Sequence, residues 1–271
     1  MTLQTTADPA RNAYATFAAY YDRFTADYEY DGWLAQIDDR ARALGVFGRR
    51  VLDVGCGTGK SFAPLLARGY EVTACDISPE MVEEARAKFG GEADEIFVAD
   101  MRDLPAGGPF DLVTCIDDGI NYLLTDEDLV AAFRGVADVL APGGVYAFDV
   151  NSLKTYRTAF SQTFVREVPG AVFCWRGESG TSVAPGDASS ATIEMFIAGD
   201  DDLWQRVTSR HFQRHHEPAA IRAALERAGL ECAAVAGQWP GSRLDDVVDE
   251  TQQIKLVYFA RRAARVGGDA R

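Results

Sequence analysis

The residues with the clearest capacity for chemistry are a glycine-rich loop and two acids that follow it along the chain. The apolar run 51–54 leads directly into Gly55-Cys56-Gly57-Thr58-Gly59. Glycines let a backbone approach a ligand closely, and a helix that starts after such a loop presents its N-terminus to the same ligand. Asp76 and Asp100 each end a later apolar run, where a carboxylate can accept hydrogen bonds from ribose hydroxyls or an amino group. Together these residues predict a site for a nucleoside-containing cofactor.

The glycine spacing separates the cofactors that use such a loop. The dinucleotide fingerprint is G-x-G-x-x-G, but its last position is Lys60 when counted from Gly55 and Phe62 when counted from Gly57. Asp53, just before the loop, would repel a pyrophosphate but suits a ligand with an ammonium and a sulfonium group. The loop therefore favours S-adenosylmethionine over a nicotinamide cofactor. A non-catalytic cofactor-binding module is a further alternative, since it would keep the same loop.

An alternation of strands and helices is needed to bring these residues to one edge. Within residues 50–150 we expect helices at about 60–68, 79–89 and 126–140, and strands at RVLDVGC, YEVTACD, EIFVADM, FDLVTCID and GVYAFDV. Such alternation predicts a parallel sheet, whose ligands bind beyond the carboxyl ends of the strands. Residues 14–45 should be helical, and residues 163–214 should form three antiparallel strands. A helix at 218–229 and a final pair of strands complete the expected elements.

The order of motifs resembles the class I S-adenosylmethionine-dependent methyltransferases. The resemblance covers about residues 48–150 and the terminal strand pair, and it is carried by DVGCGTG, CDIS, ADMRDLP, FDLVTC and LAPGGVYAFDV. It implies an α/β fold with a Rossmann-like seven-stranded sheet, of which the last strand is antiparallel, and an enzyme of the EC 2.1.1 type. The implied parts are an N-terminal helical lid at 1–47, a cofactor-binding core at 48–152 and 217–265, and an inserted antiparallel β cap at 153–216 that forms the acceptor pocket.

The N-terminal aromatic pattern resembles one bacterial subgroup that acts on small molecules. It matches the group with amino-sugar N,N-dimethyltransferases and glycine N-methyltransferase-like enzymes through Tyr14, Phe17, Tyr21-Asp22, Tyr30 and Trp33. A second matching segment, Asp118-Gly119-Ile120-Asn121-Tyr122-Leu123, has glycine where the group has serine, and it is preceded by another acid, Asp117. The resemblance implies that Tyr21, Tyr30 and Trp33 close over the cofactor, where aromatic faces attract a sulfonium.

The site residues expected from these arguments fall into three sets. The cofactor-binding residues are Tyr21, Tyr30, Trp33, Asp53, Gly55, Cys56, Gly57, Asp76, Ile77, Met81, Asp100, Met101 and Ile116. Methyl transfer from a sulfonium depends mainly on alignment, and a base helps only when the acceptor carries a proton that must leave. Candidates for such catalytic work are Tyr14, Tyr20, Asp117 and His211. The substrate-binding residues are Asp117, Asn121, Tyr122, Asn151, Trp175 and His216.

Composition limits the class of substrate. A formal net charge of −14 argues against a nucleic-acid surface, and no apolar run reaches the length of a membrane span. The five cysteines are scattered, which suggests reduced thiols in a cytoplasmic enzyme without a metal site. We therefore expect a small-molecule acceptor, with a homodimer left open. A nitrogen acceptor in natural-product metabolism is the first hypothesis, and C- or O-methylation of an indole- or phenol-type aromatic is the alternative.

Overall fold

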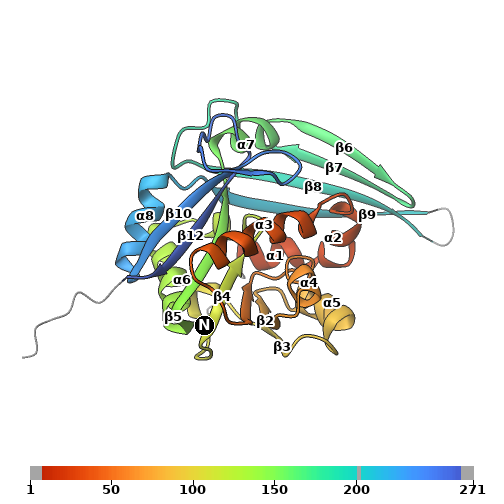
Figure 1. Cartoon of the computed structure of the whole chain (residues 1–271). Coiled ribbons are helices and arrows are strands. Elements are labelled where there is room, and N and C mark those ends of the chain that lie inside the picture. Colours follow the sequence, from red (N-terminus) through yellow and green to blue (C-terminus); the bar gives the residue numbers. More distant parts are fainter. Residues whose placement is uncertain (1–7, 200–202, 264–271) are drawn as a thin grey trace, which may run out of the picture.

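A large twisted sheet occupies the centre of the protein (Figure 1). The structure, a computed structural model, describes residues 8–199 and 203–263. The sheet has eight strands in the order β11-β10-β12-β5-β4-β1-β2-β3. Strands β5, β4, β1, β2 and β3 are parallel, whereas β12 runs antiparallel to both β5 and β10. The strands are β1 (Arg50–Val54), β2 (Glu71–Asp76), β3 (Glu95–Val98), β4 (Phe110–Cys115), β5 (Leu140–Asn151), β10 (Leu230–Gln238), β11 (Leu244–Asp245) and β12 (Lys255–Arg262).

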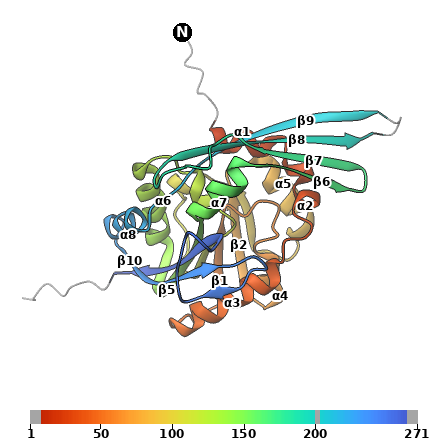
Figure 2. The ribbon, with the colours of Figure 1, turned by 90° about the horizontal axis from the view of Figure 1, so that it is seen from above.

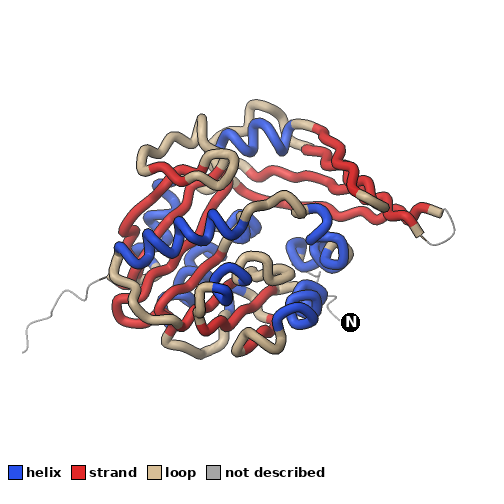
Figure 3. Tube along the Cα trace, turned by 45° about the vertical axis from the view of Figure 1, so that its right-hand side comes forward, coloured by secondary structure: helices blue, strands red, loops and turns tan. Residues whose placement is uncertain are grey.

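Helices cover both faces of this sheet and bury two apolar clusters (Figure 3). One cluster joins the sheet to α6 (Asp126–Val139) and α8 (Pro218–Arg227), and the other joins it to α3 (Tyr30–Ala43), α4 (Ala63–Ala67) and α5 (Pro79–Phe89). Capping fixes where the helices begin: the Ser78 hydroxyl accepts the Met81 N–H at the start of α5, and the Thr125 hydroxyl accepts the Asp128 N–H at the start of α6. The result is a three-layer α/β core with the strand ends held in fixed positions.

A second sheet lies over the edge where the parallel strands end (Figures 1 and 2). It has four antiparallel strands in chain order, β6 (Thr163–Val168), β7 (Ala171–Gly177), β8 (Ala188–Ala198) and β9 (Trp204–Arg214). The N-terminal helices α1 (Pro9–Ala15) and α2 (Ala18–Phe24) pack beneath it through Phe17 and Phe24, which contact a cluster that includes Phe173, Ile193 and Met195. The small sheet and these two helices together form a roof over the strand ends.

The expected fold class is confirmed, with local corrections that have physical reasons. The seven expected strands are present, and β11 adds a two-residue strand at the edge. The cap has four strands rather than three, because the segment expected as one strand turns at Pro169-Gly170, where Gly170 adopts a positive φ of 70°. The N-terminal helical stretch is divided into α1, α2 and α3 and starts earlier, at the Asp8 cap and Pro9. Helix α7 (Leu153–Thr158) was not expected.

Three short helical turns follow strands or lead into them. The first, η1 (Met101–Asp103), follows β3, the second, η2 (Gly119–Tyr122), follows β4, and the third, η3 (Ala159–Ser161), leads into the small sheet. Residues 1–7 of the expected lid and residues 264–265 of the expected core lie outside the described residues. None of the described helices is long and apolar enough to span a membrane.

Candidate active site

The glycine loop leaves β1 in a conformation that only glycine adopts without strain. Gly55 and Gly57 have φ values of 72° and 52°. The N–H groups of Gly55 and Cys56 donate to the carbonyl of Cys75, at 2.8 and 3.0 Å, so the loop is tied to the end of β2. A Cβ at Gly59 would lie 2.7 Å from the Phe89 ring, which explains a glycine at this third position. The loop therefore brings bare backbone to the strand ends.

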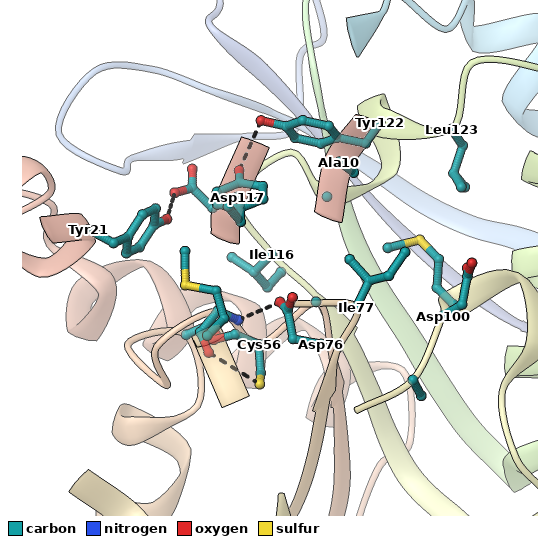
Figure 4. Close-up of a pocket in the computed structure, with 18 of the residues that line it drawn as sticks. Ala10, Tyr21, Cys56, Asp76, Ile77, Asp100, Ile116, Asp117, Tyr122 and Leu123 are labelled. Atoms are coloured by element: carbon teal, nitrogen blue, oxygen red, sulfur yellow. Dashed lines mark hydrogen bonds between the residues drawn. The ribbon is translucent and has the colours of Figure 1, made fainter. Parts of the chain in front are cut away.

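A cavity opens in front of this loop, and most of the predicted cofactor residues line it (Figure 4). We name it the loop cavity; it is lined by Tyr14, Tyr21, Tyr30, Gly55, Cys56, Gly57, Asp76, Ile77, Met81, Asp100, Met101, Arg102, Ile116, Asp117, Tyr122 and Leu123, among others. The carboxylate of Asp76 accepts the N–H groups of Gly57 and Ser78, each at 2.9 Å. Burial raises the pKa of Asp76 despite these bonds. Each of its oxygens keeps a lone pair that a ligand hydroxyl could use.

Asp100 stands at the far end of the loop cavity in a fixed ion pair. Its carboxylate accepts the backbone N–H and the guanidinium of Arg102, and Arg102 also donates to Asp8 at 2.6 Å. Burial alone would raise the pKa of Asp100, but the bonds from Arg102 hold it below its usual value. Asp8 caps α1, so Arg102 links the roof to the rim of this cavity.

Asp53 is the one predicted acid among these that the structure keeps away from the cavity. Its side chain is 0% exposed, and its two oxygens accept the hydroxyls of Ser61, at 2.5 Å, and Thr114, at 2.6 Å. Burial raises its pKa to about 6. Because successive side chains of a strand point to opposite faces of the sheet, the side chain of Asp53 points to a buried face beneath the loop. Asp53 therefore braces the loop from below, whereas the sequence suggested direct contact with the ligand.

A second cavity, of about 630 Å³, lies under the roof, and we name it the roof cavity. Many of its lining side chains are aromatic, and Trp175 stacks on Phe164 with the ring centroids 5.7 Å apart. Its lining includes Tyr14, Phe17, Tyr21, Phe24, Tyr28, Tyr30, Trp33, Asp117, Asp118, Tyr122, Asn151, Phe160, Phe164, Trp175, His211, Gln213, Gln238 and Lys255. Trp33, expected over the cofactor, is found here instead.

The two cavities meet at five residues that line both, and we name these the collar. They are the four phenols of Tyr14, Tyr21, Tyr30 and Tyr122 and the carboxylate of Asp117. Tyr30 donates to Asp117 at 2.8 Å, and Tyr21, shown pointing toward Asp117 in Figure 4, donates at 3.3 Å. The collar is thus the passage through which a group would move from one cavity to the other.

A buried lysine holds the acids beside the collar. Lys255 Nζ lies 2.7 Å from carboxylate oxygens of Asp117 and Asp118 and 2.9 Å from one of Asp149. Burial opposes charge on all four groups, but the lysine lowers the pKa of Asp117 and the three carboxylates raise the pKa of Lys255. Lys255 also lies 5.4 Å from the centre of the Trp33 ring. Three carboxylates thus surround one ammonium at the border of the cavities.

The segment after β4 is strained in a way that serves this arrangement. Asp117 and Asp118 have positive φ values of 73° and 58°, which are uncommon for residues other than glycine. Their N–H groups both donate to the carboxylate of Asp149, at 2.6 and 3.0 Å. These two bonds offset the strain and turn the side chain of Asp117 into the collar.

Besides Asp53, three predicted residues do not reach either cavity. Tyr20 packs in the apolar cluster between the roof helices and the small sheet. Asn121 is buried, where its side chain accepts the N–H of Asn151 and donates to the carbonyl of Arg214. His216 is buried outside both cavities, and burial lowers its pKa to about 4. Tertiary packing turned these side chains away from the openings, although their segments do border the site.

The residues that sequence reasoning missed are mostly charged groups inside apolar strands. Lys255 opens the apolar run of β12, and Asp149 interrupts the apolar run of β5. A charged side chain in a strand that is otherwise buried requires a partner, which is the signal that could have found this pair.

Among the described residues, no group of three or more histidine, cysteine, aspartate or glutamate side chains could hold a metal ion.

Comparisons with known proteins identify the family. Residues 51–144 match the family described as "Methyltransferase domain". The cypemycin N-terminal methyltransferase of a Streptomyces species is 36% identical over 198 residues, which cover 72% of this chain and 77% of that protein. The chain therefore belongs to the S-adenosylmethionine-dependent methyltransferases, and S-adenosylmethionine is its cofactor.

Solved structures share the whole architecture. A crystal structure of an S-adenosylmethionine-dependent methyltransferase from Clostridium acetobutylicum ATCC 824 is 25% identical, with a TM-score of 0.78, and the match covers 93% of this chain and 100% of that one. The structure of S-adenosylmethionine-bound CalS10, an amino pentose methyltransferase from Micromonospora echinaspora involved in calicheamicin biosynthesis, is 24% identical, with a TM-score of 0.68 over 91% of this chain and 95% of that one. The latter likeness shows the fold alone.

Proposed function

We propose that the protein transfers the methyl group of S-adenosylmethionine to a nitrogen atom of a small-molecule metabolite. The observation that carries this proposal is the collar, because it joins a cavity whose lining groups suit the cofactor to a separate cavity of a size suited to a small acceptor. When bound, the cofactor supplies an activated methyl group on a sulfonium. The protein then has to align an acceptor atom with that methyl group across the collar.

The donor and acceptor groups of the loop cavity fit this cofactor. Asp76 has free lone pairs for two ribose hydroxyls, and Ile77, Met81 and Met101 offer apolar surfaces to a flat base. Asp100 lies at the rim of the same cavity, and an amino group that donates to it would share oxygens that each already accept two contacts from Arg102. The collar carboxylate of Asp117 favours the positive charge of a sulfonium or ammonium nearby. We propose that the cofactor lies in the loop cavity.

The size and lining of the roof cavity favour a single small molecule over a polymer. Ligand sites of small molecules have volumes of about 300 to 1,000 Å³ and predominantly apolar linings. The roof cavity, at about 630 Å³ and rich in aromatic rings, falls within that range. We propose that it holds the acceptor.

The protonation states around the collar favour nitrogen over a phenolic oxygen. A neutral amine attacks with its own lone pair, whereas a phenol must lose a proton to become a good nucleophile. Burial raises the pKa values of Tyr14, Tyr21 and Tyr30, and Lys255 keeps the pKa of Asp117 low. These groups are poor proton acceptors at neutral pH, so an acceptor that needs no base suits the collar best. Burial raises the pKa of Asp118 to about 6, and this carboxylate, in the roof cavity beside the collar, is the base that a phenol would need.

The relatives support the same class of acceptor. The names of the cypemycin enzyme and of CalS10 indicate an N-terminus and an amino pentose as acceptors, and CalS10 is involved in calicheamicin biosynthesis. By analogy we propose an amine-bearing acceptor in natural-product metabolism for this chain.

Methylation of an aromatic oxygen or carbon is the second candidate, and the lining of the roof cavity favours it. Trp175 and Phe164, whose ring planes are 11° apart, line this cavity among other aromatic side chains, and aromatic rings can pack against a planar acceptor. This lining suits an indole or a phenol as well as an arylalkylamine, whereas a phenol would first have to give its proton to Asp118, which lies outside the collar.

Isotope transfer from labelled S-adenosylmethionine to matched acceptor libraries tests the proposal. One library holds amino sugars and arylalkylamines, and the other holds phenols and indoles with the same ring systems. We expect N-methylated products by mass spectrometry, together with release of S-adenosylhomocysteine. Asp76→Asn serves as the control with impaired cofactor binding. Products from the phenol and indole library alone would overturn the assignment to nitrogen and favour the second candidate.

A further inference from the structure

Tyr14 starts a chain of four hydrogen bonds that leads away from the collar. Its hydroxyl lies 2.9 Å from that of Tyr122, which lies 2.7 Å from Nδ1 of His211. Nε2 of His211 lies 2.9 Å from the hydroxyl of Ser209, which lies 2.5 Å from the carbonyl oxygen of Ala13. The chain therefore connects η2 and β9 and then returns to α1, the helix that carries Tyr14 itself.

The far end of this chain determines the direction of every bond in it. A carbonyl oxygen can only accept a hydrogen bond, so the Ser209 hydroxyl donates its one proton to the carbonyl oxygen of Ala13. Ser209 must then accept from His211, which places the imidazole proton on Nε2 and leaves Nδ1 as an acceptor. Tyr122 therefore donates to Nδ1 of His211, and Tyr14 must donate to Tyr122.

The chain holds its protons in place and does not carry them out. His211 is only 3% exposed, and burial lowers its pKa to about 4, so the imidazole is neutral near pH 7. The titratable groups that face it are the phenols of Tyr14, from α1, and Tyr122, from η2, while Trp175, from β7, stacks on its ring. The terminal carbonyl of Ala13 cannot accept a transferred proton at neutral pH. His211 is therefore a positioning residue rather than the base that the sequence suggested.

We propose that this one-way chain makes the hydroxyl of Tyr14 a fixed hydrogen-bond acceptor at the collar, and that Tyr14 thereby selects acceptor nitrogens that carry an N–H. With its proton committed to Tyr122, Tyr14 presents only oxygen lone pairs to a ligand. Because Tyr14 lines both cavities, a nitrogen that donates to it lies at the passage between them. The proposal rests on the proposed amine acceptor and adds the residue that discriminates among amines.

The bonding changes balance without any proton leaving the acceptor. The lone pair of the nitrogen forms the new N–C bond, the S–C bond breaks with its electron pair left on sulfur, and the nitrogen becomes an ammonium. The N–H that donates to Tyr14 stays in place throughout and strengthens as the nitrogen gains positive charge. Primary and secondary amines have this N–H, whereas the reactive free base of a tertiary amine lacks it.

Histidine NMR tests the chain without any knowledge of the acceptor. In the full chain, labelled with ¹⁵N and saturated with S-adenosylhomocysteine, His211 should be the neutral Nε2–H tautomer from about pH 6 to about pH 8. The chain has three histidines, and the signals that disappear in His211→Gln belong to His211. If His211→Gln fails to fold, the single variants His215→Gln and His216→Gln assign the other two histidines and so identify His211 by elimination. An Nδ1–H tautomer, or titration of His211 in this range, would overturn the proposal.

Three amines that differ only in substitution test the selection itself. Benzylamine, N-methylbenzylamine and N,N-dimethylbenzylamine are offered with S-adenosylmethionine, and the products are measured by mass spectrometry. We expect Tyr14→Phe to lower the preference for the first two over the third by about three- to tenfold, the worth of one hydrogen bond. Tyr20→Phe, the same substitution on a side chain outside both cavities, should keep the wild-type preference.

The outcomes separate this inference from the proposed function. Unchanged preference in Tyr14→Phe, with normal binding of S-adenosylhomocysteine, overturns the role of Tyr14 but leaves N-methylation standing. If wild type methylates none of the three amines while it methylates phenols in the libraries above, the proposed function fails and the selection for N–H fails with it. In that case the histidine spectra still report whether the chain fixes the hydroxyl of Tyr14 as an acceptor.

Discussion

Replacement of Asp76 by asparagine is the most direct test of the loop cavity as the cofactor site. In the wild-type protein both oxygens of this carboxylate already accept a backbone N–H, from Gly57 and from Ser78. Asparagine keeps one acceptor oxygen and turns an NH₂ group toward the other N–H. The variant therefore loses both the negative charge and one of the two acceptor atoms that a ribose diol would use.

The size of the effect follows from these contacts. A hydrogen bond to a charged group contributes about 1.5 to 3 kcal/mol, so Asp76→Asn should raise the Kd for S-adenosylhomocysteine roughly 10- to 150-fold. The unliganded fold should lose about 1 to 3 kcal/mol at most, because the NH₂ group faces a buried backbone N–H that loses its acceptor. Removal of the charge offsets part of this loss, because burial raises the pKa of Asp76 and its ionised form is therefore stabilised less in the folded protein than in water.

Calorimetry and thermal unfolding read out the two parts of this prediction separately. Isothermal titration gives the Kd, and the melting temperature without ligand gives the stability. Asp94→Asn is the matched control, because Asp94 is an exposed aspartate at the opposite end of the same sheet region and does not line the cavity. Unaltered affinity in Asp76→Asn, with the control also unaltered, would refute the assignment of the loop cavity to the cofactor.

Three further substitutions test the collar and the groups beneath it. In steady-state kinetics, Asp117→Asn should lower turnover of an amine about tenfold or more. In calorimetry, the same variant should change the Kd for S-adenosylhomocysteine less than about threefold. The reverse pattern would assign Asp117 to the cofactor alone. Lys255→Met should destabilise the fold by about 3 to 5 kcal/mol at pH 7 in chemical unfolding, because three buried carboxylates lose their cation, and by less at lower pH, where carboxylates protonate. Burial raises the pKa of Asp53 to about 6 in the folded protein, so the folded state favours the protonated carboxyl group. This contribution to the free energy of unfolding is complete below the unfolded pKa of Asp53 and is lost as the pH rises through about 6. Asp53→Asn removes this loss, so the stability of the variant relative to wild type should increase by up to about 3 kcal/mol from acid to neutral pH; a pH-independent difference would show that Asp53 keeps an ordinary pKa.

The core of the fold could be predicted because its signals are local. Apolar strands that end in glycine or aspartate, and the Ser78-Pro79 start of α5, are determined by residues close together in the chain. The positions of Gly55, Gly57 and Asp76 then follow from the rule that parallel strands end at a common edge. The same logic placed Asp117 at that edge, because it directly follows β4.

The collar could not be predicted in detail, because it is assembled over long distances in the chain. Tyr14 and Tyr122 are 108 positions apart, and Tyr122 and His211 are 89 apart. Helical periodicity indicates that Trp33 is buried, but only the packing of α3 against β12 decides that its ring lies beside Lys255 rather than over the loop cavity. The turn at Pro169-Gly170 differs from these, because a Pro-Gly dipeptide is a local turn signal from which the fourth roof strand could have been predicted.

The charges around the collar suit a reaction that moves a positive charge over a short distance. Transfer of a methyl group from a sulfonium to a neutral amine removes a charge from one cavity and creates it in the next. Asp117 borders both cavities, Asp118 borders the roof cavity, and both surround the ammonium of Lys255 together with the buried Asp149. The same fixed carboxylates therefore face the positive charge before and after transfer, so little reorganisation is required during the reaction. An acceptor that arrived as a phenolate would instead bring negative charge toward these carboxylates, which is an electrostatic reason for nitrogen that is independent of how a phenol would lose its proton.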